Sequence, residues 1–256
     1  MNMSEKEQLL DLALRVGKKA AELLMQRPDI LEVSTKSSDV DIVTQMDKAS
    51  EALIVSSILA ERPQDGMIGE EGADRDSTSG ITWVIDPLDG TVNYFYGLPG
   101  WNVSVAAKDK DGVVVGVVVC PTLNSTWWAV RGGGAFHNGD KLQCNNPVEL
   151  NRTMLATGFA YESEKRALQL QFINTLMPEI RDIRRNGAAA VDLCFVGAGN
   201  VDAYFESGLH EWDVAAGGLI AQEAGALLTQ HQIGGQNFTL AAGAHLHQSL
   251  RNTLGL

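Results

Sequence analysis

Two aspartates in the six-residue stretch Asp86-Pro87-Leu88-Asp89-Gly90-Thr91 give the strongest chemical signal in the chain. The stretch follows Ile81-Thr82-Trp83-Val84-Ile85, a short run of mainly β-branched and aromatic residues that predicts a buried strand. Both carboxylates therefore come at a strand end, separated by a stiff proline and followed by a glycine that lets a ligand approach the backbone. Hard oxygen ligands in a rigid frame suit Mg²⁺, which usually shares its coordination shell with substrate phosphate. The stretch predicts a site for phosphate chemistry.

Two further acidic residues also lie at predicted element ends. Glu70 lies in a Gly-Glu-Glu-Gly segment after a short apolar run, and Asp213 precedes an alanine-rich helix. Each has a structural alternative, because Glu70 could be a solvated loop residue and Asp213 could be the N-cap of that helix. The paired aspartates are harder to explain as turn formers, because the N–H groups of Gly90 and Thr91 would be free to hold a phosphate.

Length and charge limit the class of protein. With 256 residues, 45% of them hydrophobic, the chain can form one compact domain or two closely packed subdomains. We expect an N-terminal subdomain over residues 1–148 and a C-terminal subdomain over residues 149–256. The 32 acidic residues outnumber the 20 basic ones, which argues against nucleic-acid binding. A formal charge of -12 also repels anionic substrates, so a phosphate site here would need cations.

Cysteine and charge patterns indicate a cytoplasmic protein. Cys120, Cys144 and Cys194 are widely spaced and form no Cys-x-x-Cys pair, which favours buried thiols in a reducing compartment. Charged residues interrupt the first apolar segment, so we expect neither a signal peptide nor a membrane span. The histidines in turns and near the C-terminus, among them His247, are expected to be solvated.

Periodicity predicts the elements that must position these residues. Ser4 and Glu7 form a capping-box pattern at the start of a helix that should end before Pro28, and a second helix is expected over residues 46–60. Between residues 101 and 144, strand patterns separated by glycine-rich turns predict an antiparallel meander. Its strands are expected at residues 102–107, 112–120 and 126–130. After residue 151, strand-like and helix-like segments alternate.

With these motifs in view, the chain resembles the inositol monophosphatase family of Mg²⁺-dependent, lithium-sensitive phosphatases. The resemblance rests on three acidic motifs in the family's order: Glu70 in Gly-Glu-Glu, residues 86–91, and residues 212–217. It extends from about Leu9 to Gly243. Further matching segments are Lys36-Ser37-Ser38, Asp47, and residues 131–136 and 187–190. The resemblance implies an α/β fold, a layered α-β-α-β-α sandwich of the type shared with fructose-1,6-bisphosphatase, and a homodimer.

The resemblance also implies two to three Mg²⁺ ions at each site. Glu70, Asp86 and the carbonyl of Leu88 would bind the first ion. Asp86, Asp89 and Asp213 would bind the second, and Glu70 with water would hold a third, weaker one.

The remaining roles implied by the resemblance concern water and substrate. Thr91, paired with Asp47, would activate the attacking water, with Glu70 as a further catalytic residue. The amides around Gly90 and Thr91 would contact the phosphate. The positions that would contact substrate are Asp89, Ala189, Glu206, His210 and residues 158–161.

The implied chemistry agrees with the residue types. Two metal ions roughly 3.5–4 Å apart can activate a water and neutralise charge on the leaving oxygen. The sequence therefore predicts a Mg²⁺-dependent phosphomonoesterase, an inositol-phosphate phosphatase that hydrolyses inositol monophosphate or a similar small polyol or sugar monophosphate.

Three alternatives remain open. Histidinol phosphate or fructose 1,6-bisphosphate could be the substrate, because Ala188 stands where many relatives carry Ser or Thr. A haloacid-dehalogenase-type phosphatase would need Asp-x-Asp-Gly-Thr, whereas two residues separate Asp86 from Asp89 here. A non-catalytic, metal-dependent binder of a phosphorylated ligand or of a protein has no need for a water activator such as Thr91.

Overall fold

The computed structural model describes residues 1–35 and 41–256, so the predicted Lys36-Ser37-Ser38 match lies outside the described residues. The helices of the described chain are α1 (Met3–Met25), α2 (Gln45–Glu61), α3 (Thr91–Tyr96), α4 (Ser163–Leu176), α5 (Ala189–Gly197), α6 (Glu211–Glu223) and α7 (Ala244–Leu254). Two short 3-10 helices are η1 (Pro121–Leu123) and η2 (Leu150–Arg152).

Two large sheets form the frame of the molecule. The first has the strand order β3-β4-β5-β6-β7-β8-β9, and it is antiparallel except for the parallel pair β3 and β4. Its strands are β3 (Gly66–Gly69), β4 (Thr82–Asp89), β5 (Asn102–Asp109), β6 (Gly112–Cys120), β7 (Ser125–Val130), β8 (Gly134–His137) and β9 (Asp140–Lys141). The predicted antiparallel meander is therefore confirmed.

The second large sheet is mixed, with the order β11-β10-β12-β14-β13. Strand β10 is parallel to both of its neighbours, whereas β14 is antiparallel to β12 and β13. Its strands are β10 (Met154–Thr157), β11 (Asp182–Arg184), β12 (Ala203–Ser207), β13 (Ala226–Ile233) and β14 (Gln236–Gly243). A small hairpin pairs β1 (Val33–Thr35) with β2 (Ile42–Thr44).

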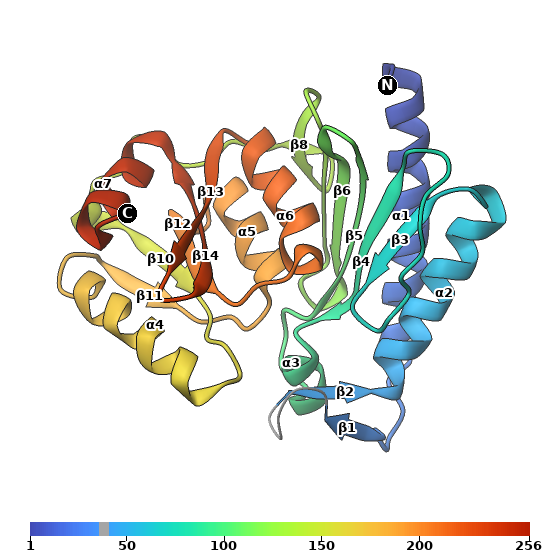
Figure 1. Ribbon diagram of the computed structural model, residues 1–256, viewed down its shortest axis with the longest axis horizontal. Coiled ribbons are helices and arrows are strands. Elements are labelled where there is room, and N and C mark those ends of the chain that lie inside the picture. The colour runs from blue at the N-terminus through green and yellow to red at the C-terminus, as the bar shows by residue number, and fades with distance from the viewer. Residues whose placement is uncertain (36–40) are drawn as a thin grey trace.

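The two sheets alternate with helical layers, as Figure 1 shows: α1 and α2 cover one sheet, α5 and α6 lie between the sheets, and α4 and α7 cover the other. The predicted α-β-α-β-α sandwich is confirmed. Strand β4 shows why the layers form, because Trp83 and Ile85 belong to the core under α1 and Val84 to the core under α6. A sheet that is apolar on both faces must be covered on both faces.

Small residues let the central layer lie close to the first sheet. A Cβ atom at Gly116 of β6 would lie 2.8 Å from Cα of Ala216 in α6. A Cβ atom at Gly217 would lie 2.7 Å from the carbonyl oxygen of Ala190 in α5. Both contacts involve backbone atoms that cannot rotate away. The start of α6, which carries Asp213, is therefore held firmly against the sheet that carries the paired aspartates.

Two expectations about local structure were wrong. The capping box of α1 is formed by Asn2 and Glu5, not by Ser4 and Glu7, so the helix begins earlier than predicted. His247 is buried, since α7 packs against the second sheet, and its ring shares a hydrogen bond of 2.8 Å with Thr229.

The predicted join at residues 148–149 falls between the last strand of the first sheet and the first strand of the second. The division into two subdomains stays a prediction. All three cysteines are buried. Within residues 1–35 and 41–256, none of the helices combines the length and the apolar character needed to cross a bilayer.

Candidate active site

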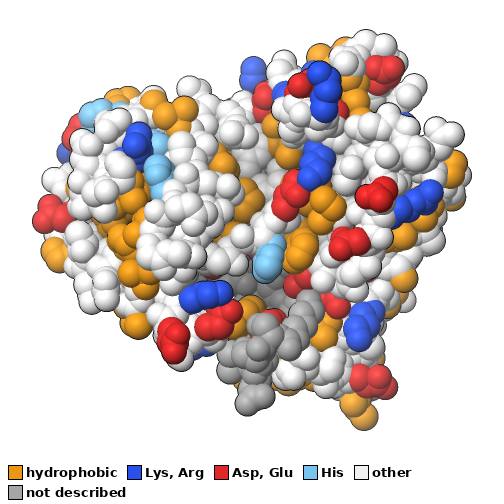
Figure 2. All heavy atoms as spheres, viewed as in Figure 1, with side chains coloured by type: hydrophobic (Ala, Val, Ile, Leu, Met, Phe, Trp, Pro, Cys, Tyr) orange, Lys and Arg blue, Asp and Glu red, His pale blue; other side chains and the backbone are white. Residues whose placement is uncertain are grey.

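A cavity of about 260 Å³ opens between the two halves of the molecule. Figure 2 shows this face of the protein hollowed between its lobes. The cavity is lined by nearly all of the predicted site residues: Glu70, Asp86, Leu88, Asp89, Gly90, Thr91, Ala189, Glu206, His210 and Asp213. Asp47 is the exception, because it is fully buried behind Thr91.

A bulge in β4 brings the paired aspartates to one cavity. Asp86 and Asp89 are three positions apart on β4, but their partners on β5, Ser104 and Asn102, are only two positions apart. In a regular strand, residues three apart would point to opposite faces, and one extra residue corrects this. The N–H group of Leu88 donates to Oδ1 of Asp86 at 3.1 Å and stabilises the bulge.

The backbone turns at Gly90 into α3. Gly90 has φ of 85°, a left-handed conformation that glycine adopts without strain. A Cβ atom there would lie 3.3 Å from the Cβ of Ala188, so Gly90 also lets the two halves approach each other at the cavity.

Thr91 and Asp47 form a buried pair behind the cavity wall. The hydroxyl of Thr91 donates to Oδ1 of Asp47 at 2.9 Å and lies 3.1 Å from the carbonyl oxygen of Leu88. The other oxygen of Asp47 accepts from the N–H and hydroxyl groups of Thr44, at 2.8 and 2.6 Å. Burial raises the pKa of Asp47, and the hydrogen bonds from Thr44 and Thr91 lower it. The sequence-predicted pair is therefore in hydrogen-bond contact.

Two buried aspartates, Asp86 and Asp89, and the partly buried Asp213 repel one another across the cavity. Burial raises the pKa of Asp86, and the charges of Glu70, Asp89 and Asp213 raise it further. Burial likewise raises the pKa of Asp89 to about 6 and the pKa of Asp213, whose next largest cause is the charge of Asp89. In the part of the chain that the structure describes, no Lys or Arg forms a salt bridge with these three aspartates.

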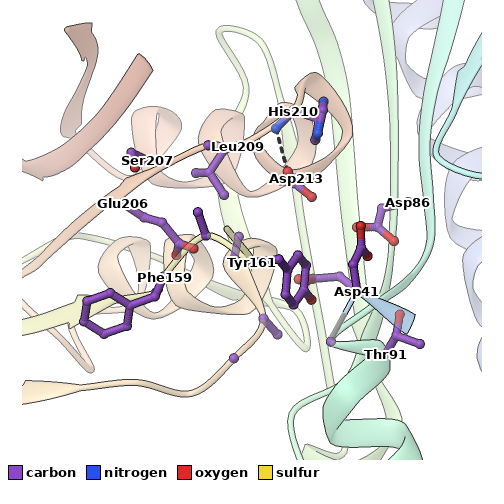
Figure 3. Close-up of a pocket in the computed structure, with 18 of the residues that line it drawn as sticks. Asp41, Asp86, Thr91, Phe159, Tyr161, Glu206, Ser207, Leu209, His210 and Asp213 are labelled. Atoms are coloured by element: carbon purple, nitrogen blue, oxygen red, sulfur yellow. Dashed lines mark hydrogen bonds between the residues drawn. The ribbon is translucent and has the colours of Figure 1, made fainter. Parts of the chain in front are cut away.

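Hydrogen bonds from both halves hold the aspartates in place. Asp89 accepts from the side-chain amide of Asn102 at 2.8 Å and from the N–H group of Ala190 at 2.9 Å. Asp213 accepts from the N–H group of His210 at 2.6 Å. Figure 3 shows Asp86 and Asp213 facing the same space from β4 and α6. Asp213 is the third residue of α6, so the alternative that it is the N-cap residue is wrong; His210 has that position.

The donor chemistry fits divalent cations. All the acidic donors are hard oxygens, and a bound cation would favour the ionised forms of Asp86, Asp89 and Asp213, which burial and repulsion disfavour. Within the described ranges, no group of three or more His, Cys, Asp or Glu side chains is arranged so that it could hold a metal ion. The division of these carboxylates among individual ions remains a proposal.

Glu206 lies on the C-terminal side of the cavity. Its carboxylate accepts a hydrogen bond of 2.6 Å from the hydroxyl of Tyr204, and burial raises its pKa to about 7. A Cβ atom at Gly158 would overlap this carboxylate, so the 158–161 segment passes directly beside it. His210 stacks on Trp212, with ring centroids 4.6 Å apart.

Sequence reasoning missed several residues of the site. Asn102 and Ser50 contact the bulged segment, and Asp41 and Arg185 line the cavity. None lies in an acidic motif. Arg185 immediately precedes a matched segment, residues 187–190, which is the only sequence signal that could have pointed to it.

Comparison with known proteins agrees with the layered fold and the acidic cavity: the chain belongs to the inositol monophosphatase family, whose model matches residues 5–254. It is 44% identical to the Nus factor SuhB of Pasteurella multocida over 226 residues, which cover 86% of this chain and 84% of the relative. It is 41% identical to the inositol-1-monophosphatase of Mycobacterium bovis, with coverage of 83% and 77%.

Solved structures show the same fold. The extragenic suppressor protein SuhB of Bartonella henselae superposes with a TM-score of 0.90 at 30% identity, covering 96% of this chain and 98% of that one. The inositol monophosphatase of Thermotoga maritima gives a TM-score of 0.87 at 31% identity, with 97% of each chain covered.

The raised pKa values predict that Mg²⁺ stabilises this protein more at pH 7.5 than at pH 5. The pKa of Asp89 is about 6 in the folded chain, above the ordinary value of about 3.9. Between these values the folded state binds more protons than the unfolded state, so metal-free stability falls as the pH rises from about 4 to about 6. Mg²⁺ binds the ionised form and offsets that loss.

The measurement is the difference in melting temperature between excess Mg²⁺ and a chelator, at both pH values. The difference in melting temperature between Mg²⁺ and chelator should be small in Asp89→Asn, because this variant loses one of the titrating carboxylates but keeps the shape of the side chain. An equal Mg²⁺ effect at pH 5 and 7.5 in the wild type would contradict the coupling between protons and metal.

Proposed function

We propose that this protein is a Mg²⁺-dependent phosphomonoesterase that hydrolyses inositol monophosphate, or a similar small polyol or sugar monophosphate, by direct attack of water. One observation carries the proposal: Asp86, Asp89 and Asp213 line the same cavity as Thr91, whose hydroxyl donates to the buried Asp47. The aspartates alone would suit a metal-binding protein, but the hydroxyl–carboxylate pair adds a group that can accept a proton. Membership of a phosphatase family supports the same conclusion.

The residues that would hold Mg²⁺ are the hard oxygen donors of the cavity. Glu70, Asp86 and the carbonyl of Leu88 would hold one ion, and Asp86, Asp89 and Asp213 a second. When bound, Mg²⁺ supplies the positive charge that lowers the pKa of water and neutralises the leaving oxygen. Glu70 would also hold a third, weaker ion through water.

Thr91 would orient the attacking water. Its hydroxyl donates to Asp47, which leaves the lone pairs of the Thr91 oxygen to accept a proton from water. The ionised form of Asp47 makes the Thr91 oxygen a better acceptor. The amides around Gly90 and Thr91 would hold the phosphate oxygens beside this pair.

The alcohol part of the substrate would face the C-terminal side of the cavity. The carboxylate of Glu206 already accepts one hydrogen bond from Tyr204, and its remaining lone pairs can accept from a substrate hydroxyl. Ala189 and His210 lie on the same side of the cavity. A homodimer, which the family resemblance implies, is part of this proposal.

A second candidate comes from the relatives named Nus factor SuhB. In such a role the chain would act without hydrolysis. The two candidates separate in cells that lack this gene: a variant without phosphatase activity that fully replaces the wild-type protein would favour the Nus-factor role.

The decisive experiment is a phosphate-release panel with inositol 1-phosphate, histidinol phosphate, fructose 1,6-bisphosphate and glycerol phosphate. We expect Mg²⁺-dependent release, fastest with inositol 1-phosphate, because Glu206 can accept a hydrogen bond from a ring hydroxyl. A chelator and the folded Asp89→Asn variant should each abolish release. If no phosphate were released from any of the four esters, the proposed activity would be rejected.

Thr91→Ala should lower kcat by about 10²- to 10⁴-fold, because positioned proton-transfer groups contribute on that order. The matched control is Thr91→Ser, which keeps the hydroxyl that donates to Asp47. Steady-state kinetics at saturating Mg²⁺ would measure both variants. If Thr91→Ala changed KM alone, Thr91 would not be the water activator.

Lithium should inhibit phosphate release more than sodium does at matched ionic strength. Li⁺ is close to Mg²⁺ in size but carries half its charge, so it would stabilise the leaving oxygen less among Asp86, Asp89 and Asp213. Titration with LiCl against NaCl separates this effect from general screening. Equal responses to the two salts would show that the second metal site does not take Li⁺.

A further inference from the structure

Helix α2 contacts the active-site wall through one buried face. Ser50 and Glu51 follow Asp47 by three and four residues, so both lie on the same side of the helix as Asp47. Asp47 holds the hydroxyl of Thr91, and the hydroxyl of Ser50 donates to the carbonyl oxygen of Pro87 at 2.8 Å. The helix thus anchors Pro87, which lies between the paired aspartates, and Thr91, which follows them.

Glu51 anchors a different segment, the loop that carries Glu70. One carboxylate oxygen of Glu51 accepts from the N–H group of Glu71 at 3.0 Å, and the N–H group of Ala73 is a second donor. One residue before Glu71, the N–H group of Glu70 donates to the carbonyl oxygen of Ile85 in β4 at 3.2 Å. The loop is therefore held by β4 on one side of the Glu70 side chain and by Glu51 on the other.

The carboxylate of Glu51 occupies a closely fitted place. The side chain is buried, with 6% exposed. A Cβ atom at Gly69 would overlap its Oε2 atom, and Gly69 does not have a positive φ. An alanine at position 69 therefore suits the backbone but displaces the Glu51 carboxylate.

We propose that Glu51 is a positioning residue for metal binding, which fixes the backbone of residues 71–73 and so holds Glu70 beside Asp86. Glu70 and Asp86 repel each other when both are ionised, as metal binding requires, so their approach needs support from the backbone. Mg²⁺ demands near-ideal octahedral geometry, so a displaced carboxylate is a poor ligand. This inference rests on the metal site of the proposed function, but not on the identity of the substrate.

The test measures binding of Mn²⁺ directly, from the paramagnetic resonance signal of the free ion. Glu51→Gln keeps the side-chain size but replaces one acceptor oxygen with a donor, and Gly69→Ala displaces an unchanged Glu51. Both should weaken Mn²⁺ binding about 10- to 100-fold, which is typical for residues that orient metal ligands. The control is Glu61→Gln, the same substitution in the last turn of α2, where Glu61 pairs with Arg15 at the surface. It should leave Mn²⁺ affinity unchanged.

Melting temperatures in a chelator separate positioning from a purely structural role. The inference would be overturned if Glu51→Gln and Gly69→Ala both lowered the melting temperature without metal but bound Mn²⁺ as tightly as the wild type. If Glu51→Gln fails to fold, Gly69→Ala decides the question alone, because it retains the buried carboxylate. A wild-type protein that binds no Mn²⁺ would overturn the metal site of the proposed function together with this inference, whereas unchanged binding in the variants would overturn only the inference.

Discussion

Mutual repulsion among buried carboxylates is the constraint on which the rest of this structure depends. Burial disfavours the ionised forms of Asp86, Asp89 and Asp213, and the charge of Asp89 raises the pKa values of the other two further. Removing charges from water costs several kcal/mol for each uncompensated ion, on the order seen for buried ions in general. The fold must therefore supply hydrogen-bond donors and a rigid frame wherever one of these side chains is placed.

The donors come from both halves of the molecule, so the site forms only when the halves are packed together. Asp89 belongs to the first sheet but accepts a hydrogen bond from Ala190, at the start of α5 in the central layer. Close contact of Gly116 with Ala216 fixes α6 on the same sheet and sets the position of Asp213. Small residues in the central layer thus have a functional consequence, because any widening of the layer would separate Asp213 from Asp89.

Much of this arrangement follows from the sequence because it depends on local patterns. The strand before Asp86 is apolar on both faces, which identifies a central strand, and the spacing of the two aspartates with a proline between them indicates a ligand-bearing turn. The α-β-α-β-α layering was likewise predicted, through the resemblance to a family. These features need only neighbouring residues or a family motif.

The features that were missed depend on contacts between distant segments. In the sequence, nothing distinguishes Glu51 from other glutamates on helices. Its role depends on the N–H groups of Glu71 and Ala73, which only the fold brings to it. The same holds for Asn102, which becomes a donor to Asp89 only through the bulge. His247 was expected to be solvated because a C-terminal helix of mixed polarity gives no local sign of the sheet that covers it.

Helix α2 and strand β4 hold different parts of the acidic cavity, and both are needed because of the same repulsion. Strand β4 can place Asp86 and Asp89 because the bulge is held by its neighbour β5, whereas β3 ends at Gly69 and does not hold the residues around Glu71. A helix packed across the face of the sheet can do so, since its side chains project toward segments that do not pair with one another. Asp47, Ser50 and Glu51 each contact a different part of the wall from one rigid element. The acidic cavity therefore needs a polar face on a buried helix, which accounts for two buried carboxylates, Asp47 and Glu51, on α2 that do not themselves line the cavity.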